Sequence, residues 1–229
     1  MSTPRADQDE FWSAEEGDRY YTRNRDVLKA KRADTDPAIG LVRAHGLQPD
    51  HVLELGCADG WRLELLRRET GCHAVGVDAS AGAIEAGRAD YPELELHEGT
   101  LAAVPIETRS FDLVIVYFVF HWNARETLMR ACSEVDRLVA DGGHLIVGDF
   151  LPDRPHRRVY HHAANEGVNT FKQDYAGVFG ASGLYHEIER VIFDATSKHA
   201  TRGADVQSDN RGGCALLRKS LTEGYPVAE

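Results

Sequence analysis

The chain has 229 residues, of which 42% are apolar and 28% charged, a composition that suits one soluble globular domain with a sizeable core. Its formal net charge of −11 argues against a nucleic-acid partner, because backbone phosphates are bound by a basic protein face. No apolar run approaches the roughly 20 residues of a membrane span, and the polar N-terminus is unlike a signal peptide. We therefore expect a cytoplasmic protein without a membrane partner.

The first part of the chain, residues 1–45, has helical patterns and is expected to form a cap or lid on a domain spanning residues 46–229. In that domain short β-rich runs alternate with amphipathic helices, which predicts βαβ units, a parallel sheet and helices on both faces. The expected strands are 51–55, 74–77, 94–97, 111–116 and 144–147; the expected helices are 61–69, 80–91 and 125–139.

Beyond Asp149 the alternation changes. Residues 153–183 are expected to form one or two irregular helices, and residues 187–193 and 213–217 to form strands. The polar stretch 196–211 between these strands is expected to be a mobile hairpin loop.

A turn of small residues, Gly56-Cys57-Ala58-Asp59-Gly60, follows the first expected strand. Open α/β sheets bind ligands at this edge, and the next helix directs its first N–H groups toward them. A dinucleotide fingerprint would place its third glycine at Trp61, so NAD and FAD are disfavoured. The turn lacks the Gly-Lys-Ser/Thr of a P-loop, and the four cysteines lack zinc-like spacing, so we expect no triphosphate and no metal.

Glu54, Gly56 and Gly60 resemble the E/D-x-G-x-G-x-G signature of class I S-adenosylmethionine (SAM) dependent methyltransferases, with Ala58 at the second glycine position. Four further segments resemble that family in order and spacing: 75–78, 99–101, 110–122 and 137–145. The resemblance implies an α/β, Rossmann-like, doubly wound, seven-stranded, mostly parallel sheet with an antiparallel last strand and an N-terminal helical cap. It also implies SAM as the cofactor.

The resemblance implies a set of cofactor-binding residues. Asp78 would accept hydrogen bonds from the ribose hydroxyls, Glu54 would orient the turn, and Thr100 stands where the family often has an aspartate near the adenine. The N-terminal segment is similar to small-molecule methyltransferases in which such a helix covers the cofactor. The full expected set is Glu54, Gly56, Cys57, Ala58, Asp78, Ala79, Thr100, Leu101, Tyr117, His121, Tyr21 and Arg25.

Fewer sequence features indicate which residues bind the molecule that accepts the methyl group. A hydroxyl acceptor would make a base useful, and the candidates are His121, His161 and His162; their alternative is a packed or surface histidine. A carboxylate or phosphonate acceptor would instead require arginines and no base. The candidate substrate-binding residues are Tyr20, Trp122, Tyr160, Lys172 and Tyr175.

We therefore predict an enzyme that methylates an oxygen or nitrogen, less readily a carbon, of a small molecule in sugar or secondary-metabolite biosynthesis. Two alternatives stay open. One is non-methyl chemistry on SAM, such as cyclisation or carboxypropyl transfer, and the other is a non-catalytic partner subunit with the same fold. A homodimer also stays open.

Overall fold

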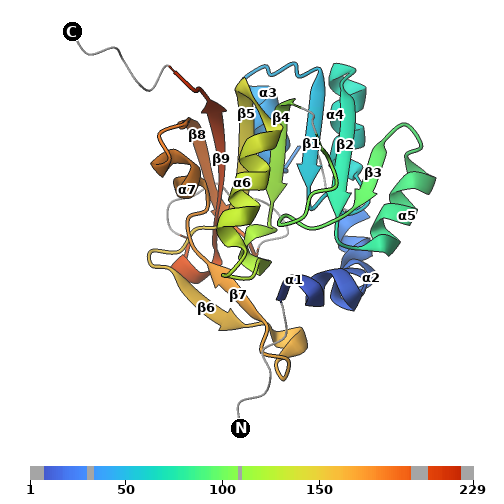
Figure 1. Ribbon diagram of the computed structural model, residues 1–229, viewed down its shortest axis with the longest axis vertical. Helices are drawn as coiled ribbons and strands as arrows, with labels where there is room; N and C mark the ends of the chain where they lie inside the picture. The colour runs from blue at the N-terminus through green and yellow to red at the C-terminus, as the bar shows by residue number, and fades with distance from the viewer. Residues whose placement is uncertain (1–7, 30–33, 108–109, 197–205, 223–229) are drawn as a thin grey trace.

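The computed structural model describes residues 8–29, 34–107, 110–196 and 206–222 (Figure 1). Its centre is a seven-stranded sheet with the order β3-β2-β1-β4-β5-β9-β8. The strands are β1 (His51–Leu55), β2 (His73–Asp78), β3 (Glu95–Glu98), β4 (Phe111–Tyr117), β5 (Val139–Phe150), β8 (Tyr185–Asp194) and β9 (Arg211–Lys219).

Strand direction confirms the expected sheet. β1, β2, β3, β4 and β5 pair in parallel, whereas β9 pairs antiparallel with both β5 and β8. The strand order reverses between β1 and β4, and open α/β sheets bind ligands outside the carboxyl ends of the strands at such a point.

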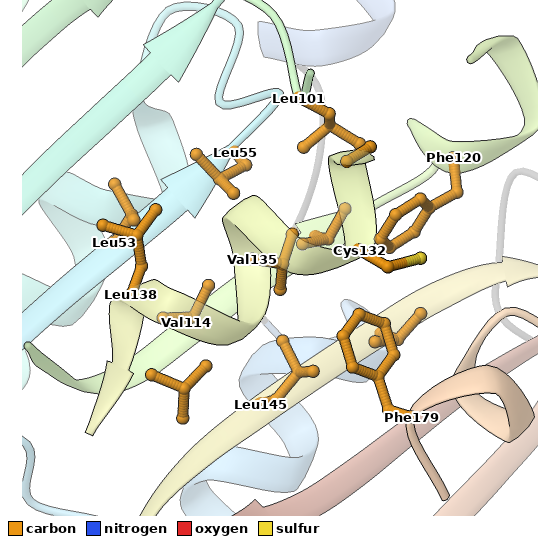
Figure 2. Packing of buried hydrophobic residues seen from close by; sticks show 14 of the residues in the cluster. Leu53, Leu55, Leu101, Val114, Phe120, Cys132, Val135, Leu138, Leu145 and Phe179 are labelled. Carbon is orange, nitrogen blue, oxygen red and sulfur yellow. The ribbon is translucent and has the colours of Figure 1, made fainter. Parts of the chain in front are cut away.

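Helices cover both faces of the sheet, as alternating strand residues require. On one face, α6 (Leu128–Leu138) and α7 (Ala176–Ala181) pack against the sheet, and Figure 2 shows Val135 and Cys132 of α6 above Val114 and Leu145. On the other face, α3 (Pro37–Ala44), α4 (Trp61–Thr70) and α5 (Ala81–Asp90) bury their apolar residues. Every strand of the sheet except β3 therefore contributes residues to two separate cores, one on each face.

The N-terminal helices lie at the carboxyl ends of the parallel strands (Figure 1). They are α1 (Gln8–Phe11), the π-helical turn η1 (Trp12–Glu16) and α2 (Gly17–Lys29). Asp18 of α2 accepts hydrogen bonds from Ser80 Oγ (2.6 Å) and Gly82 N (2.9 Å), which fastens the helix to the start of α5. The expected domain boundary at residue 45 stays a prediction; α3, which precedes it, belongs to the core of the sheet.

The segment after β5 differs from the expectation of irregular helices over 153–183. β6 (His156–Val159) and β7 (Asn169–Lys172) form an antiparallel ribbon joined through a single 3-10 turn, η3 (His161–Ala163), and only α7 is an α-helix. Most of β6 is exposed, so the sequence of this strand has no apolar period. The ribbon is stabilised by contacts with residues distant in sequence: Gln8 binds the backbone of Asn169, and Asp209 pairs with Arg158.

Two further boundaries differ from the expected ones. The helix expected over 125–139 is α6, and β5 begins directly at Val139, so the residues between that helix and the strand expected at 144–147, including Gly142 (φ +78°), already belong to β5. Of the expected loop 196–211, residues 197–205 lie outside the described residues, and a 3-10 turn, η4 (Ser208–Asn210), precedes β9. Within the described segments, no helix is long and apolar enough to cross a membrane.

Candidate active site

The turn after β1 is shaped by close backbone packing. Gly56 has a φ of +79°, and a Cβ at this position would lie 2.1 Å from Cγ2 of Val119, so only glycine fits. The N–H groups of Gly56 and Cys57 both donate to the carbonyl of Val77, at 2.7 and 3.1 Å. Ala58, at the second glycine position of the motif, also adopts a left-handed conformation (φ +51°). The turn is thereby held against the ends of β2 and β4.

Asp78, the last residue of β2, faces this turn. Its carboxylate accepts hydrogen bonds from the N–H groups of Ala58 (2.8 Å) and Ser80 (2.9 Å). Burial raises the pKa of Asp78, although these two N–H groups act in the opposite direction. A carboxylate fixed in this way, at the edge of a ligand cavity, is suited to accept hydrogen bonds from hydroxyl groups.

A cavity of about 800 Å³ lies between the carboxyl ends of the strands and the N-terminal helices. Ligand pockets range from about 300 to 1,000 Å³, so this volume suits a cofactor together with a small acceptor. Ten of the expected cofactor residues line it: Tyr21, Gly56, Cys57, Ala58, Asp78, Ala79, Thr100, Leu101, Tyr117 and His121.

Two expected cofactor residues do not line the cavity. Arg25 is exposed on α2. Glu54 is 0% exposed and forms an ion pair with Arg62, which also pairs with Asp36 at 2.9 Å. Burial opposes the positive charge of Arg62, but Asp36 and Glu54 outweigh it and raise the pKa of the guanidinium. Glu54 therefore contacts the cavity wall, through Arg62, and not the cavity itself.

Arg62 and Asp36 were not among the expected site residues. The Arg62 guanidinium lies 4.7 Å from the ring centroid of Tyr117 and 4.8 Å from that of Trp61, and all four side chains line the cavity. Both were missed because an arginine in a charged helix is usually a surface residue, and because Asp36 is distant in sequence. One sequence feature could have indicated the ion pair: Arg62 follows Glu54 by eight residues, across the glycine turn.

The expected substrate-binding residues divide into two groups. Tyr20 and Trp122 line the cavity, with ring centroids 4.8 Å apart. Tyr160, Lys172 and Tyr175 are buried but are not among the lining residues. The Tyr160 hydroxyl donates to Glu16, the Lys172 ammonium to the carbonyl of Asp209, and the Tyr175 hydroxyl to the carbonyl of Phe171.

The three candidate histidines are also separated. His161 and His162 are exposed on η3 with their rings against each other, 3.9 Å between centroids, and neither lines the cavity. His121 lines the cavity and is 3% exposed. Its Nδ1 lies 2.8 Å from Oδ1 of Asp149, at the end of β5. The structure therefore brings one of the three histidines to the cavity.

Comparison with known proteins agrees with this geometry. Residues 52–143 match a family model described as a methyltransferase domain. A probable SAM-dependent methyltransferase of Mycolicibacterium smegmatis is 27% identical over 211 residues, covering 81% of this chain and 78% of the relative. The (+)-O-methylkolavelool synthase of Herpetosiphon aurantiacus is 21% identical over 156 residues, covering 63% and 54%.

A solved structure shares the fold over almost the whole chain. The 1,6-didemethyltoxoflavin-N1-methyltransferase of Burkholderia thailandensis, solved with 1,6-didemethyltoxoflavin and S-adenosylhomocysteine, has a TM-score of 0.69 and 15% identity, covering 96% of this chain and 93% of that one. The family model, the sheet order and the glycine turn together define a class I SAM-dependent methyltransferase. The chain is therefore an enzyme of that family, and its cofactor is SAM.

Proposed function

We propose that the chain transfers a methyl group from SAM to an oxygen or nitrogen atom of a small-molecule acceptor, and that both ligands share the one cavity. The observation that supports this is the mixed lining of the cavity. It combines the glycine turn and Asp78 with aromatic side chains at the ends of β4, β5 and β8. Methyl transfer needs proximity and alignment of two bound molecules, which a continuous cavity provides.

At the cofactor end we assign roles by the family resemblance. Asp78 accepts hydrogen bonds from the ribose hydroxyls, and Thr100 and Leu101 contact the adenine. The backbone at Cys57 and Ala58 approaches the methionine part of the cofactor. Burial raises the pKa of the Cys57 thiol well above its usual range, so the thiol stays protonated and has no nucleophilic role.

Tyr20 and Trp122, which line the same cavity, would cover the acceptor. Burial and the nearby Asp78 carboxylate raise the pKa of Tyr20, so its hydroxyl remains a hydrogen-bond donor. The names of two similar proteins support a small-molecule acceptor: one is named as the N1-methyltransferase of 1,6-didemethyltoxoflavin, and the other is named for an O-methylated product. Secondary metabolism is accordingly the setting that we propose.

The test is product analysis. The purified chain would be incubated with SAM, alone and with a panel of hydroxyl and ring-nitrogen compounds, and the products would be separated by chromatography. We expect S-adenosylhomocysteine and a methylated compound, formed only when an acceptor is present. Methylthioadenosine from SAM alone would contradict methyl transfer and support cyclisation or carboxypropyl chemistry.

A further inference from the structure

A buried histidine–carboxylate pair lies at the cavity wall. His121 and Asp149 are each 3% exposed, and both carboxylate oxygens hold the histidine: Oδ1 lies 2.8 Å from Nδ1, and Oδ2 accepts the His121 backbone N–H at 3.2 Å. This double contact fixes the ring orientation, because the carboxylate is itself attached to the end of a central strand. Nδ1–H donating to the carboxylate leaves Nε2 as the basic nitrogen of a neutral imidazole.

Nε2 is the free position of this ring. Within the described part of the chain it has no hydrogen-bond partner, and the side chain lines the cavity. Val119, two residues before His121, contacts the glycine turn at the point where a Gly56 Cβ would lie. His121 is thereby positioned next to the turn that binds the cofactor in this family.

The cavity beyond His121 has aromatic walls. Phe118, Phe150 and Phe193 come from the ends of β4, β5 and β8, and all three line the cavity. The ring centroid of Phe118 lies 5.2 Å from that of Phe150 and 6.1 Å from that of Phe193, and His121 packs edge-on against Phe150 at 5.0 Å. Phe118 itself adopts a left-handed backbone (φ +57°), a strained conformation typical of functional positions. Such walls accept a flat apolar molecule.

The charges of the described lining residues disfavour an anionic acceptor. Five aspartates line the cavity, Asp9, Asp26, Asp36, Asp78 and Asp194, against one arginine, Arg62, whose charge is balanced by Asp36 and Glu54. Lys172 lies 4.0 Å from the Phe150 ring centroid, but its ammonium donates to the carbonyl of Asp209 outside the lining. Among the described residues that line the cavity, a carboxylate or phosphate would therefore meet no cation beyond the paired Arg62.

We propose that His121, oriented by Asp149, is the general base of this enzyme and that the acceptor is a neutral, flat molecule with an aromatic hydroxyl or ring N–H. This inference rests on the proposed methyl transfer. The acceptor heteroatom gives its proton to His121 Nε2 while its lone pair forms the bond to the methyl carbon. The sulfur–methyl bond breaks with its electron pair left on sulfur, and the imidazolium formed is stabilised by Asp149 until water takes the proton.

A matched acceptor series tests the base by activity. Methyl transfer from labelled SAM would be measured with three acceptors. They are a naphthol, the same naphthol with a nitro group, which is ionised at the assay pH, and the corresponding naphthoate. We expect the wild-type chain to methylate the naphthols and not the naphthoate. His121→Gln should lower the rate on the naphthol ~100-fold or more and lower it far less on the ionised nitronaphthol, because that acceptor needs no base. His186→Gln, an exposed histidine on β8, is the matched control and should keep the wild-type rates.

A binding measurement distinguishes a variant that has lost the base from one that has lost its folded structure. The nitronaphthol would be titrated into the complex with S-adenosylhomocysteine at a lower pH, near its own pKa in water, where its absorbance reports the ionised fraction when bound. Wild type should hold more of the ionised form than His121→Gln, and Asp149→Asn, a positioning variant, should give an intermediate value. Equal ionised fractions in all three, or equal losses of rate on both naphthols, would overturn the assignment of His121.

The proposal for the acceptor class can be wrong while the proposal of methyl transfer holds, and the experiment distinguishes the two cases. A chain that binds S-adenosylhomocysteine but methylates the naphthoate and neither naphthol would overturn the proposed acceptor and leave methyl transfer standing. A chain that binds no S-adenosylhomocysteine would overturn the proposed function itself.

Discussion

At the scale of single residues, the buried ion cluster of Arg62, Glu54 and Asp36 shapes the cofactor end of the cavity. It joins three elements: Glu54 lies on β1, Arg62 on α4, and Asp36 caps α3 by accepting the N–H of Ile39 at 3.0 Å. Two carboxylates outside water are tolerated only because the guanidinium bridges them. The same side chain also forms part of the cavity wall through its contact with Tyr117.

Replacing the cation of this cluster should be strongly destabilising. Arg62→Met keeps much of the side-chain volume but leaves two buried carboxylates without their shared cation, so the free energy of unfolding in urea should fall by about 3–5 kcal/mol. Arg43→Met removes a half-exposed pair with Glu69 and should lower it by about 1 kcal/mol or less. Similar values for the two variants would contradict this account of the cluster.

Ionisation of the Asp78 side chain should lower the free energy of unfolding. Burial raises its pKa in the folded chain above the ordinary value of about 3.9. The native state then binds the proton more tightly than the unfolded state, so the contribution to stability is present below that value and is lost as the pH rises through the raised pKa. Asp78→Asn does not titrate, and the wild-type unfolding free energy should therefore fall relative to this variant as the pH rises above about 4. A difference that is constant or grows with pH in urea unfolding would contradict the raised pKa.

At the scale of elements, the N-terminal helices are attached to the domain by a few specific contacts. Gln8 donates through Nε2 to the carbonyls of Trp122 (2.6 Å) and Asn169 (2.8 Å), and its Oε1 accepts the Asn169 N–H at 3.0 Å. Trp12 stacks on Trp122 with a centroid distance of 4.1 Å. These contacts link the cap both to the segment after β4 and to the β6–β7 ribbon, so the roof of the cavity depends on them.

Removing the Gln8 side-chain hydrogen bonds should loosen the cap without unfolding the sheet. Gln8→Leu abolishes three hydrogen bonds at a buried position, and local opening of residues 8–16 should become easier by about 1–3 kcal/mol. Amide hydrogen exchange should therefore speed up in these residues and stay unchanged in α6. Ser13→Ala, which removes one exposed hydrogen bond to Glu10, is the control. Unchanged exchange over 8–16 in Gln8→Leu would show that other contacts hold the cap.

At the scale of the whole molecule, features with local signatures could be predicted from the sequence. The glycine turn, the strand that ends at Asp78 and the alternation of strands with helices follow from local patterns, and the family resemblance implied the seven-stranded sheet with its antiparallel last strand. The β6–β7 ribbon could not be predicted, because it is held by Gln8 and Asp209 from opposite ends of the chain. Its two strands are only four residues long, and β6 is mostly exposed, so the sequence there has no apolar period.

The acceptor side was hard to predict for the same reason. Phe150 and Phe193 face the cavity only because β5 and β8 end at its edge, which depends on the order of distant strands. Asp149 is the exception, since an acid that closes a buried strand is the signal that identified Asp78. Applied to the strand at 144–147, the same rule would have found the partner of His121.

The central claim is that the end of the cavity around Asp78 binds the cofactor. Calorimetric titration of S-adenosylhomocysteine into wild type and Asp78→Ala tests it most directly. Asp112→Ala is the control, because that carboxylate binds the N–H groups of Asp50 and His51 at the opposite edge of the sheet. We expect Asp78→Ala to weaken binding by about 2–3 kcal/mol, the loss of charge-assisted hydrogen bonds, and Asp112→Ala to bind as wild type does. Wild-type affinity in Asp78→Ala would contradict the account.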